Sequence, residues 1–124
     1  PDLQMAGKTG TAQVRRITAE ERLTGVIRNE DLPWEKRDHA LFVDYAPYDN
    51  PKVAVAVIVE HGGGGSATAA PIARDITLFA LTGQMPELSH YPAGAKAQIK
   101  EEQEELAPKL FDWSTLDKKG QVQT

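Results

Sequence analysis

The residues best suited to chemistry are Lys8, Thr9, Gly10 and Thr11, which follow one another near the start of the chain. A lysine ammonium supplies a positive charge and two threonine hydroxyls donate hydrogen bonds, so this group can hold a carboxylate. Gly10 has no Cβ, which lets a ligand lie directly against the backbone and pair with its N–H and C=O groups. The four residues therefore predict an anion-binding surface.

The run Ala6–Val14 otherwise has the composition of a β-strand, so we expect the surface on an edge or cleft-facing strand. A peptide could then bind by adding itself to that edge. One alternative is a phosphate-binding loop, but Asp2 stands where that motif needs its first glycine, and no helix-forming run follows Thr9. The other alternative is a surface strand whose lysine only keeps an edge soluble. The elements that follow in the chain decide between them.

Length and composition exclude several classes of protein. The chain has 124 residues, 40% of them apolar, which is enough for one modest core, and no apolar run reaches the about 18 residues of a membrane span. With no cysteine there is neither a disulfide nor a thiolate metal site. A net charge of −4 without a basic stripe disfavours a nucleic-acid partner. Because Pro1 is not an initiator methionine, we expect a piece of a longer protein.

A long irregular connection, Ile17–His39, follows the first strand. It mixes charged residues with glycine and proline and contains one short helical pattern at Ala19–Leu23. Connections of this length inside a compact domain are usually functional or mobile. We expect it to cover or border the Lys8 strand.

Two further strands, Ala40–Pro47 and Val53–Glu60, are separated by turn residues at Tyr48–Pro51, which predicts an antiparallel hairpin. The second strand carries valines on one face and two alanines with Ile58 on the other. Since both faces are apolar, we predict that this strand is central and covered on both sides. Its small alanines would let a helix approach closely.

Apolar residues recur at helical spacing over Ala67–Thr82, with Pro71 in the first turn, either Ser66 or Thr68 as the cap, and Gly83 at the end. The preceding glycine run, Gly62–Gly65, predicts a wide turn. A dinucleotide fingerprint is disfavoured there because no second strand with an acidic residue follows.

From residue 84 to residue 124 the chain becomes polar, and we predict a flexible C-terminal tail with a solvated helix at Ala95–Leu106. The aromatic residues Phe111 and Trp113 lie in this tail. The sequence also predicts no metal site, because no other ligand converges on His61. His39 beside Asp38 is best interpreted as a hydrogen-bonded structural pair.

Three runs together resemble class B penicillin-binding proteins, and within them the transpeptidases of cell elongation. They are Ala6–Val14, Ala46–Val57 and Glu60–Gly65, and the resemblance covers roughly Asp2 to Gly83. Asp44 departs from the pattern, because a small residue is expected at its position. The resemblance implies an α+β fold: the C-terminal part of a penicillin-binding, serine β-lactamase-like domain, with a three-stranded antiparallel sheet and a packed C-terminal helix. By this resemblance, residues 1–83 are the C-terminal portion of the transpeptidase domain and residues 84–124 are the tail.

The family resemblance also implies roles for the first motif. Lys8 would supply positive potential, the hydroxyls of Thr9 and Thr11 would bind the substrate carboxylate, and the Thr11 N–H would be one oxyanion donor. Gly10 would keep the strand open. The substrate would be a peptidoglycan stem peptide ending in D-Ala-D-Ala, or a β-lactam that mimics it, and no cofactor is expected.

The nucleophile of such an enzyme is absent from this chain, since none of its serines begins a Ser-x-x-Lys or a Ser-x-Asn: Ser66, Ser89 and Ser114. We therefore predict that the chain alone is inactive and that its partners include the remainder of the domain. The resemblance further implies elongation-complex proteins as partners, and a periplasmic location in a parent anchored to the inner membrane. The alternative is a non-catalytic domain of the same fold, which binds peptide or β-lactam carboxylates or serves as a scaffold.

Overall fold

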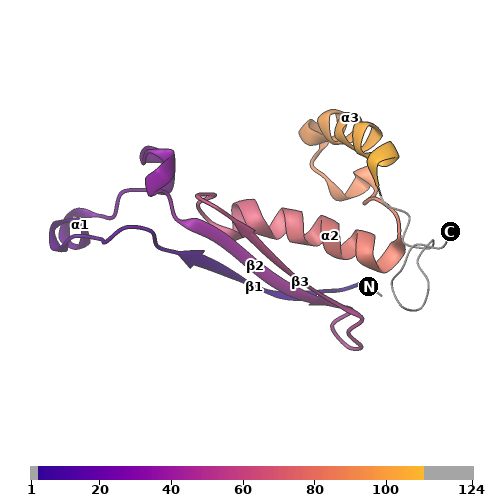
Figure 1. Cartoon of the computed structure of the whole chain (residues 1–124), viewed down its shortest axis with the longest axis horizontal. Helices are drawn as coiled ribbons and strands as arrows, with labels where there is room; N and C mark the ends of the chain where they lie inside the picture. The colour runs from indigo at the N-terminus through magenta and orange to yellow at the C-terminus, as the bar shows by residue number, and fades with distance from the viewer. Residues whose placement is uncertain (1–2, 111–124) are drawn as a thin grey trace. The chain divides into compact units, whose positions relative to one another are not determined.

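The computed structural model describes residues 3–110 of the chain. These divide into two compact units, one ending at Pro86 and the other beginning at Glu87 (Figure 1). The predicted boundary after Gly83 stays a prediction.

The first unit is built on a three-stranded antiparallel sheet in the order β1-β2-β3, whose strands are Ala6–Ala12, His39–Ala46 and Val53–Val59. The predicted hairpin is confirmed as β2 and β3. The prediction that the valine-rich strand is central was wrong for this chain, because β2 lies in the middle and β3 forms an edge. An apolar strand can be central only if another strand pairs with its far side, and within the described residues none does.

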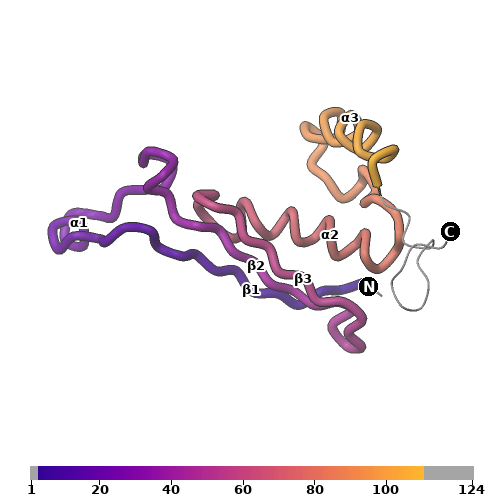
Figure 2. The backbone as a smooth tube through the Cα atoms, in the orientation of Figure 1, coloured from indigo at the N-terminus to yellow at the C-terminus, as the bar shows by residue number. Residues whose placement is uncertain are grey.

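Helix α2 (Ala70–Thr82) covers one face of the sheet (Figure 2). Thr77 on α2 donates a 2.7 Å hydrogen bond to Asp44 on β2, which identifies the covered face. We call the opposite side, which α2 does not cover, the open face. The fully buried apolar side chains are small and come from both layers: Ala40, Ala46, Ala69 and Ala73.

The predicted contact of the helix with the alanine face of β3 was wrong. The valines of β3 are half-buried, whereas Ala54, Ala56 and Ile58 are exposed. In the register of the sheet the valines lie beside Asp44 and Ala46 of β2, so they share the face that carries the bond to Thr77. The close approach of α2 comes instead from alanines of β2 and of the helix itself.

The predicted helix Ala67–Thr82 is confirmed apart from its first turn. A π-helical turn, Gly65–Ala69, precedes α2, and the predicted side-chain cap is absent. Thr68 donates to the carbonyl of Gly62 at 2.8 Å instead, because the chain folds back over the glycine turn. The helix ends as predicted at Gly83, whose φ of 71° is left-handed.

The connection between β1 and β2 extends beyond the ends of the strands, so it borders the Lys8 strand without covering its length (Figure 1). It contains the predicted short helix as α1 (Ala19–Thr24), which a capping box of Thr18 and Glu21 begins. Two 3₁₀ turns follow before β2, at Asn29–Asp31 and Trp34–Lys36.

The second unit contains helix α3 (Lys96–Leu106), which confirms the helix predicted in the polar region. None of its residues is buried. Phe111 and Trp113 lie outside the described residues. Across the part of the chain that the structure describes, every helix is too short or too polar to cross a membrane.

Candidate functional site

The predicted site lies on β1, an edge strand, as the sequence indicated. Lys8 is exposed, and its Nζ donates a 3.0 Å hydrogen bond to the carbonyl of Thr9. Lys8 pairs with Val43 and Gly10 with Leu41, so both positions belong to the open face. Thr9 and Thr11 alternate with them and belong to the helix-covered face, where both remain exposed.

The chain therefore does not bring the Lys8 ammonium and the two hydroxyls onto one face of the sheet. They are neighbours only along the outer edge of β1, to which no strand is paired within residues 3–110. A ligand that pairs with this edge can reach side chains of both faces, since an edge strand presents its unpaired backbone groups between them. The arrangement suits an extended peptide whose carboxyl end lies along the strand.

Gly7, just before the motif, and Gly10, within it, lack a side chain for different reasons. A Cβ on Gly7 would lie 2.5 Å from Cζ of Phe42, so the ring of Phe42 occupies the space of a side chain there. A Cβ on Gly10 would meet only Cβ of Leu41, at 3.4 Å. The space above Gly10 on the open face is thus left free for an incoming backbone.

The open face carries several large exposed apolar side chains. Val43 is 52% exposed, Tyr45 44% and Ile58 66%, although all three belong to strands of the sheet. Exposed apolar side chains on one sheet face are typical of a surface that another part of a protein covers.

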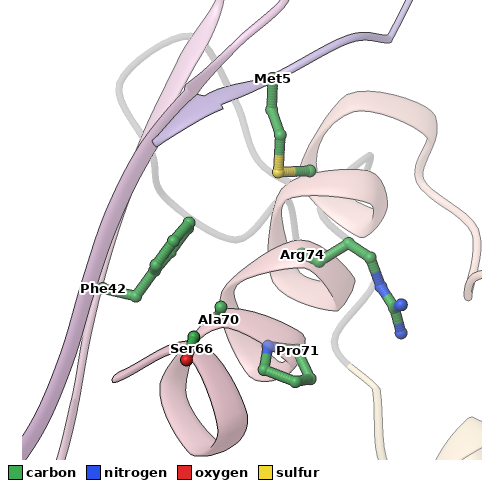
Figure 3. Close-up of a pocket in the computed structure, with 6 residues that line it drawn as sticks. All are labelled: Met5, Phe42, Ser66, Ala70, Pro71 and Arg74. Carbon is green, nitrogen blue, oxygen red and sulfur yellow. The ribbon is translucent and has the colours of Figure 1, made fainter. Parts of the chain in front are cut away.

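A groove of about 310 Å³ opens on the other side of the sheet, between the residue before β1, strand β2, the π-helical turn and the beginning of α2. Figure 3 shows Phe42 and Met5 directed towards it from the sheet side, with Ser66 and Pro71 on the helical side. Phe42 neighbours Val43 in the strand, so it belongs to the face opposite Lys8. The groove therefore lies on the side of the sheet away from Lys8, the side to which Thr9 and Thr11 belong.

Two histidines join the end of the sheet to the glycine turn. The backbone N–H of His61 donates to Nδ1 of His39 at 2.9 Å, and Nδ1 of His61 lies 2.9 Å from the carbonyl of Arg37. Nδ1 of His39 therefore accepts a hydrogen bond, whereas Nδ1 of His61 carries a proton and donates a hydrogen bond to the Arg37 carbonyl. The ring of Trp34 packs against His61, with centroids 4.4 Å apart.

The predicted pairing of His39 with Asp38 was wrong. The Asp38 carboxylate accepts from the side chain of Asn29 at 3.2 Å, because the preceding loop returns to it, and His39 turns to His61 instead. Among the described residues, no three potential ligands of the His, Asp and Glu types converge as they would at a metal site.

Asp44 is only 4% exposed, and its Oδ1 accepts the hydrogen bond from Thr77. Its Oδ2 is buried without a hydrogen-bond partner among the described residues. The family resemblance indicated only that a small residue is expected at position 44. The partner could not be found from the pattern, because Thr77 lies far along the chain.

The strongest electrostatic perturbation lies outside the site, in the connection between β1 and β2. Arg15 forms a bidentate pair with Glu21, at 2.8 and 3.0 Å. This hydrogen bonding, followed by the bond from the Thr18 backbone, lowers the pKa of Glu21 to about 2. The carboxylate thus stays ionised at neutral pH and keeps its place in the capping box of α1.

Comparison with known proteins places the chain in a family. A family model described as the penicillin binding protein transpeptidase domain matches residues 1–78. The chain is 41% identical over 105 residues to the peptidoglycan D,D-transpeptidase MrdA of Haemophilus influenzae, a match covering 83% of this chain and 16% of the relative. It is 47% identical over 64 residues to MrdA of Escherichia coli K12, covering 52% of this chain and 10% of the relative.

Two solved structures are also similar. The chain is 35% identical to Pseudomonas aeruginosa PBP2, solved in complex with WCK 5153, over 74% of this chain and 17% of that one, with a TM-score of 0.45. It is 32% identical to Helicobacter pylori PBP2, solved in complex with MreC, over 64% of this chain and 12% of that one, again with a TM-score of 0.45.

The chain spans 16% of the length of the Haemophilus relative, and the matched segment contains the Lys8 strand, the hairpin and most of α2. The resemblance inferred from three short runs is thus confirmed by a match that extends through the sheet and most of its helix. This chain belongs to the penicillin-binding protein transpeptidase domain family.

Proposed function

We propose that this chain is the C-terminal portion of the catalytic domain of a peptidoglycan D,D-transpeptidase. The parent protein, meaning the longer protein that carries this chain, would cross-link stem peptides by serine acyl transfer at D-Ala-D-Ala and would bind β-lactams. The observation that carries the proposal is the Lys8–Thr11 motif on a free sheet edge, in a member of this family. The curated relatives bear the name of that activity.

Each residue of the motif has a role that its chemistry allows. The Lys8 ammonium provides positive potential beside the substrate carboxylate, and the hydroxyls of Thr9 and Thr11 donate hydrogen bonds to it. The Thr11 N–H stabilises the oxyanion that forms when the peptide carbonyl is attacked, and the Thr11 C=O accepts from the substrate amide. The open space above Gly10 admits the substrate backbone.

The serine nucleophile and its lysine base come from the part of the parent outside this chain. The serine Oγ forms an ester with the penultimate D-Ala carbonyl as the bond to the terminal D-Ala breaks. An amine of a second stem peptide then displaces the serine. This chain would contribute the carboxylate-binding strand and one oxyanion donor, while the rest of the domain covers the open face.

Replacing Lys8 tests the proposal. In the parent protein, Lys8→Ala should slow acylation by a fluorescent penicillin on the order of 10²–10³-fold, the scale at which loss of transition-state electrostatics is felt. Lys52→Ala is the matched control, because Lys52 is also exposed but lies in the turn between β2 and β3. Acylation of the Lys8 variant at the rate of the control would remove Lys8 from the site.

A second candidate is a non-catalytic domain of the same fold that binds carboxylate peptides or acts as a scaffold. Such a domain would bind a carboxylate through the Lys8–Thr11 motif but would need no serine nucleophile. The serines of this chain do not fit the catalytic motifs. Mass spectrometry of the parent after incubation with penicillin separates the two. A covalent adduct supports the enzyme, whereas saturable binding without an adduct supports the binding domain.

The family assignment also leads us to propose partners and a location for the parent protein. We infer that elongation-complex proteins bind it, and that it works in the periplasm from an inner-membrane anchor outside this chain. Both proposals rest on kinship with the MrdA relatives. Fractionation of cells that produce the tagged parent, followed by cross-linking and identification of the attached proteins, tests them together.

A further inference from the structure

Gly65 lies against the backbone of the Lys8 strand, although it is distant in the sequence. It is buried in the π-helical turn that precedes α2. A Cβ at this position would lie 2.5 Å from the carbonyl oxygen of Leu41, 2.7 Å from that of Gly10 and 3.1 Å from the Gly10 nitrogen. All three atoms belong to backbone, so a side chain on Gly65 can be accommodated only if a strand moves.

The register of the sheet explains this close approach. Gly10 is paired with Leu41, and both positions belong to the open face. On the helix-covered face this pair therefore presents only backbone atoms. Gly65 packs against these backbone atoms on the helix-covered face. It therefore supports Gly10 from the side opposite the open face.

The glycine turn cannot simply withdraw from the sheet, because one hydrogen bond ties it to the residue before β2 and two more stiffen it internally. Gly63 donates to the carbonyl of Asp38 at 2.9 Å. Thr68 donates from its hydroxyl to the carbonyl of Gly62 at 2.8 Å and from its backbone to that of Gly64 at 3.1 Å. A side chain on Gly65 would consequently push on β1 at Gly10.

We propose that Gly65 is a positioning residue for acyl transfer. Because Gly65 has no side chain, the Gly10 backbone can lie close to the glycine turn. The position of Gly10 in turn sets the direction of the neighbouring Thr11 N–H. This inference rests on the proposed function, because it assumes that the Thr11 N–H acts on the oxyanion. A displacement of about 1 Å in such a group can cost on the order of 10²-fold in rate.

The test compares three alanine variants of the parent protein in the same turn. Gly65→Ala should lower the rate constant of acylation by a fluorescent penicillin on the order of 10²-fold, with a smaller change in the dissociation constant of the initial complex. In Gly62→Ala the new Cβ would lie 2.8 Å from Val59 and 3.1 Å from Thr68, so it strains the turn without those backbone contacts to Gly10. In Gly64→Ala it would meet nothing within 4 Å.

The Gly62 variant controls for a purely structural effect, and the Gly64 variant for the substitution itself. The proposal is overturned if Gly65→Ala acylates like Gly64→Ala. It is also overturned if the Gly65 and Gly62 variants lose acylation equally for an equal fall in unfolding temperature. Absence of acylation in the unaltered parent would refute the proposed function instead, so the two failures are distinguishable.

A second variant keeps the test decisive if Gly65→Ala does not fold. Thr68→Val removes the hydroxyl that fixes Gly62, which loosens the turn, while the bond from Gly63 to the carbonyl of Asp38 still holds it against the sheet. The double variant should fold and should acylate more slowly than Thr68→Val alone. Equal rates in these two proteins would contradict a positioning role for Gly65.

Discussion

At the scale of single residues, the buried hydrogen bond between Asp44 and Thr77 links β2 to α2. A carboxylate in a sheet core is costly unless its oxygens are hydrogen-bonded, and here one oxygen is bonded while the other has no partner among residues 3–110. The hydroxyl of Thr77 is therefore the contact that makes Asp44 tolerable at a position where the family resemblance suggested a small residue.

We predict that Thr77→Val lowers the free energy of unfolding of the parent protein by about 1–3 kcal/mol, because it leaves a buried carboxylate without its donor. Urea unfolding measures the change. Thr77→Ser is the matched control, since it keeps the hydroxyl and should lose only about 0.8 kcal/mol for the missing methyl group.

Replacing both partners tests the same bond from the other side. Adding Asp44→Ala to Thr77→Val should recover most of the lost stability, because no polar group then remains unsatisfied. If Thr77→Val is as stable as the unaltered protein, the hydrogen bond contributes nothing and another account of the buried Asp44 is needed.

At the scale of elements, the placement of α2 depends on how its two ends are built. Its beginning is held by the glycine turn and Thr68, without a side-chain cap of its own. Its end is set by Gly83, whose N–H donates to the carbonyl of Phe79 at 2.8 Å in a left-handed conformation. That conformation costs an ordinary L-residue free energy, whereas glycine adopts it freely.

We predict that Gly83→Ala destabilises the parent by about 1 kcal/mol through its backbone conformation alone, since a Cβ there would meet nothing within 4 Å. Gly64→Ala is the matched control, because its Cβ also meets open space while its φ of −82° is an ordinary one. Thermal unfolding of the two variants measures the difference. Equal unfolding temperatures would show that the left-handed end of α2 carries no cost for alanine.

At the scale of the whole molecule, the chain presents surfaces that a complete domain would cover. The far side of β3 has no strand paired to it among the described residues, and the open face displays apolar side chains. The catalytic serine motifs are missing from the same chain. These features are consistent with the proposal that this chain is one portion of a larger domain and forms one side of its active site.

We predict that the 124-residue chain alone is not labelled by a fluorescent penicillin, while the parent protein is labelled. The reason is the absence of the nucleophile, and gel fluorescence after denaturation measures it. The isolated chain should also self-associate through its uncovered sheet surfaces, which sedimentation velocity detects. Covalent labelling of the chain, or a monodisperse monomer at high concentration, would contradict the corresponding part of this prediction.

Local patterns in the sequence were sufficient for much of the fold. An alternating pattern indicated β2, a continuous run of valines and alanines with Ile58 indicated β3, and the periodicity before Gly83 indicated α2. The Lys8–Thr11 group was correctly expected on an edge strand. These predictions succeed because strand and helix periods, turn residues and the lack of a Cβ act within a few residues. The family followed from the same short runs.

The tertiary structure alone decided which surfaces meet. Both faces of β3 are apolar, so its sequence does not show which face α2 covers. The bond from Thr77 to Asp44 and the half-burial of the valines place α2 on the valine side. Four glycines follow His61, and only the packing distinguishes Gly65, pressed on the Gly10 backbone, from Gly64 in open space. Such contacts join residues far apart in the chain, and their geometry depends on the position of every element between them.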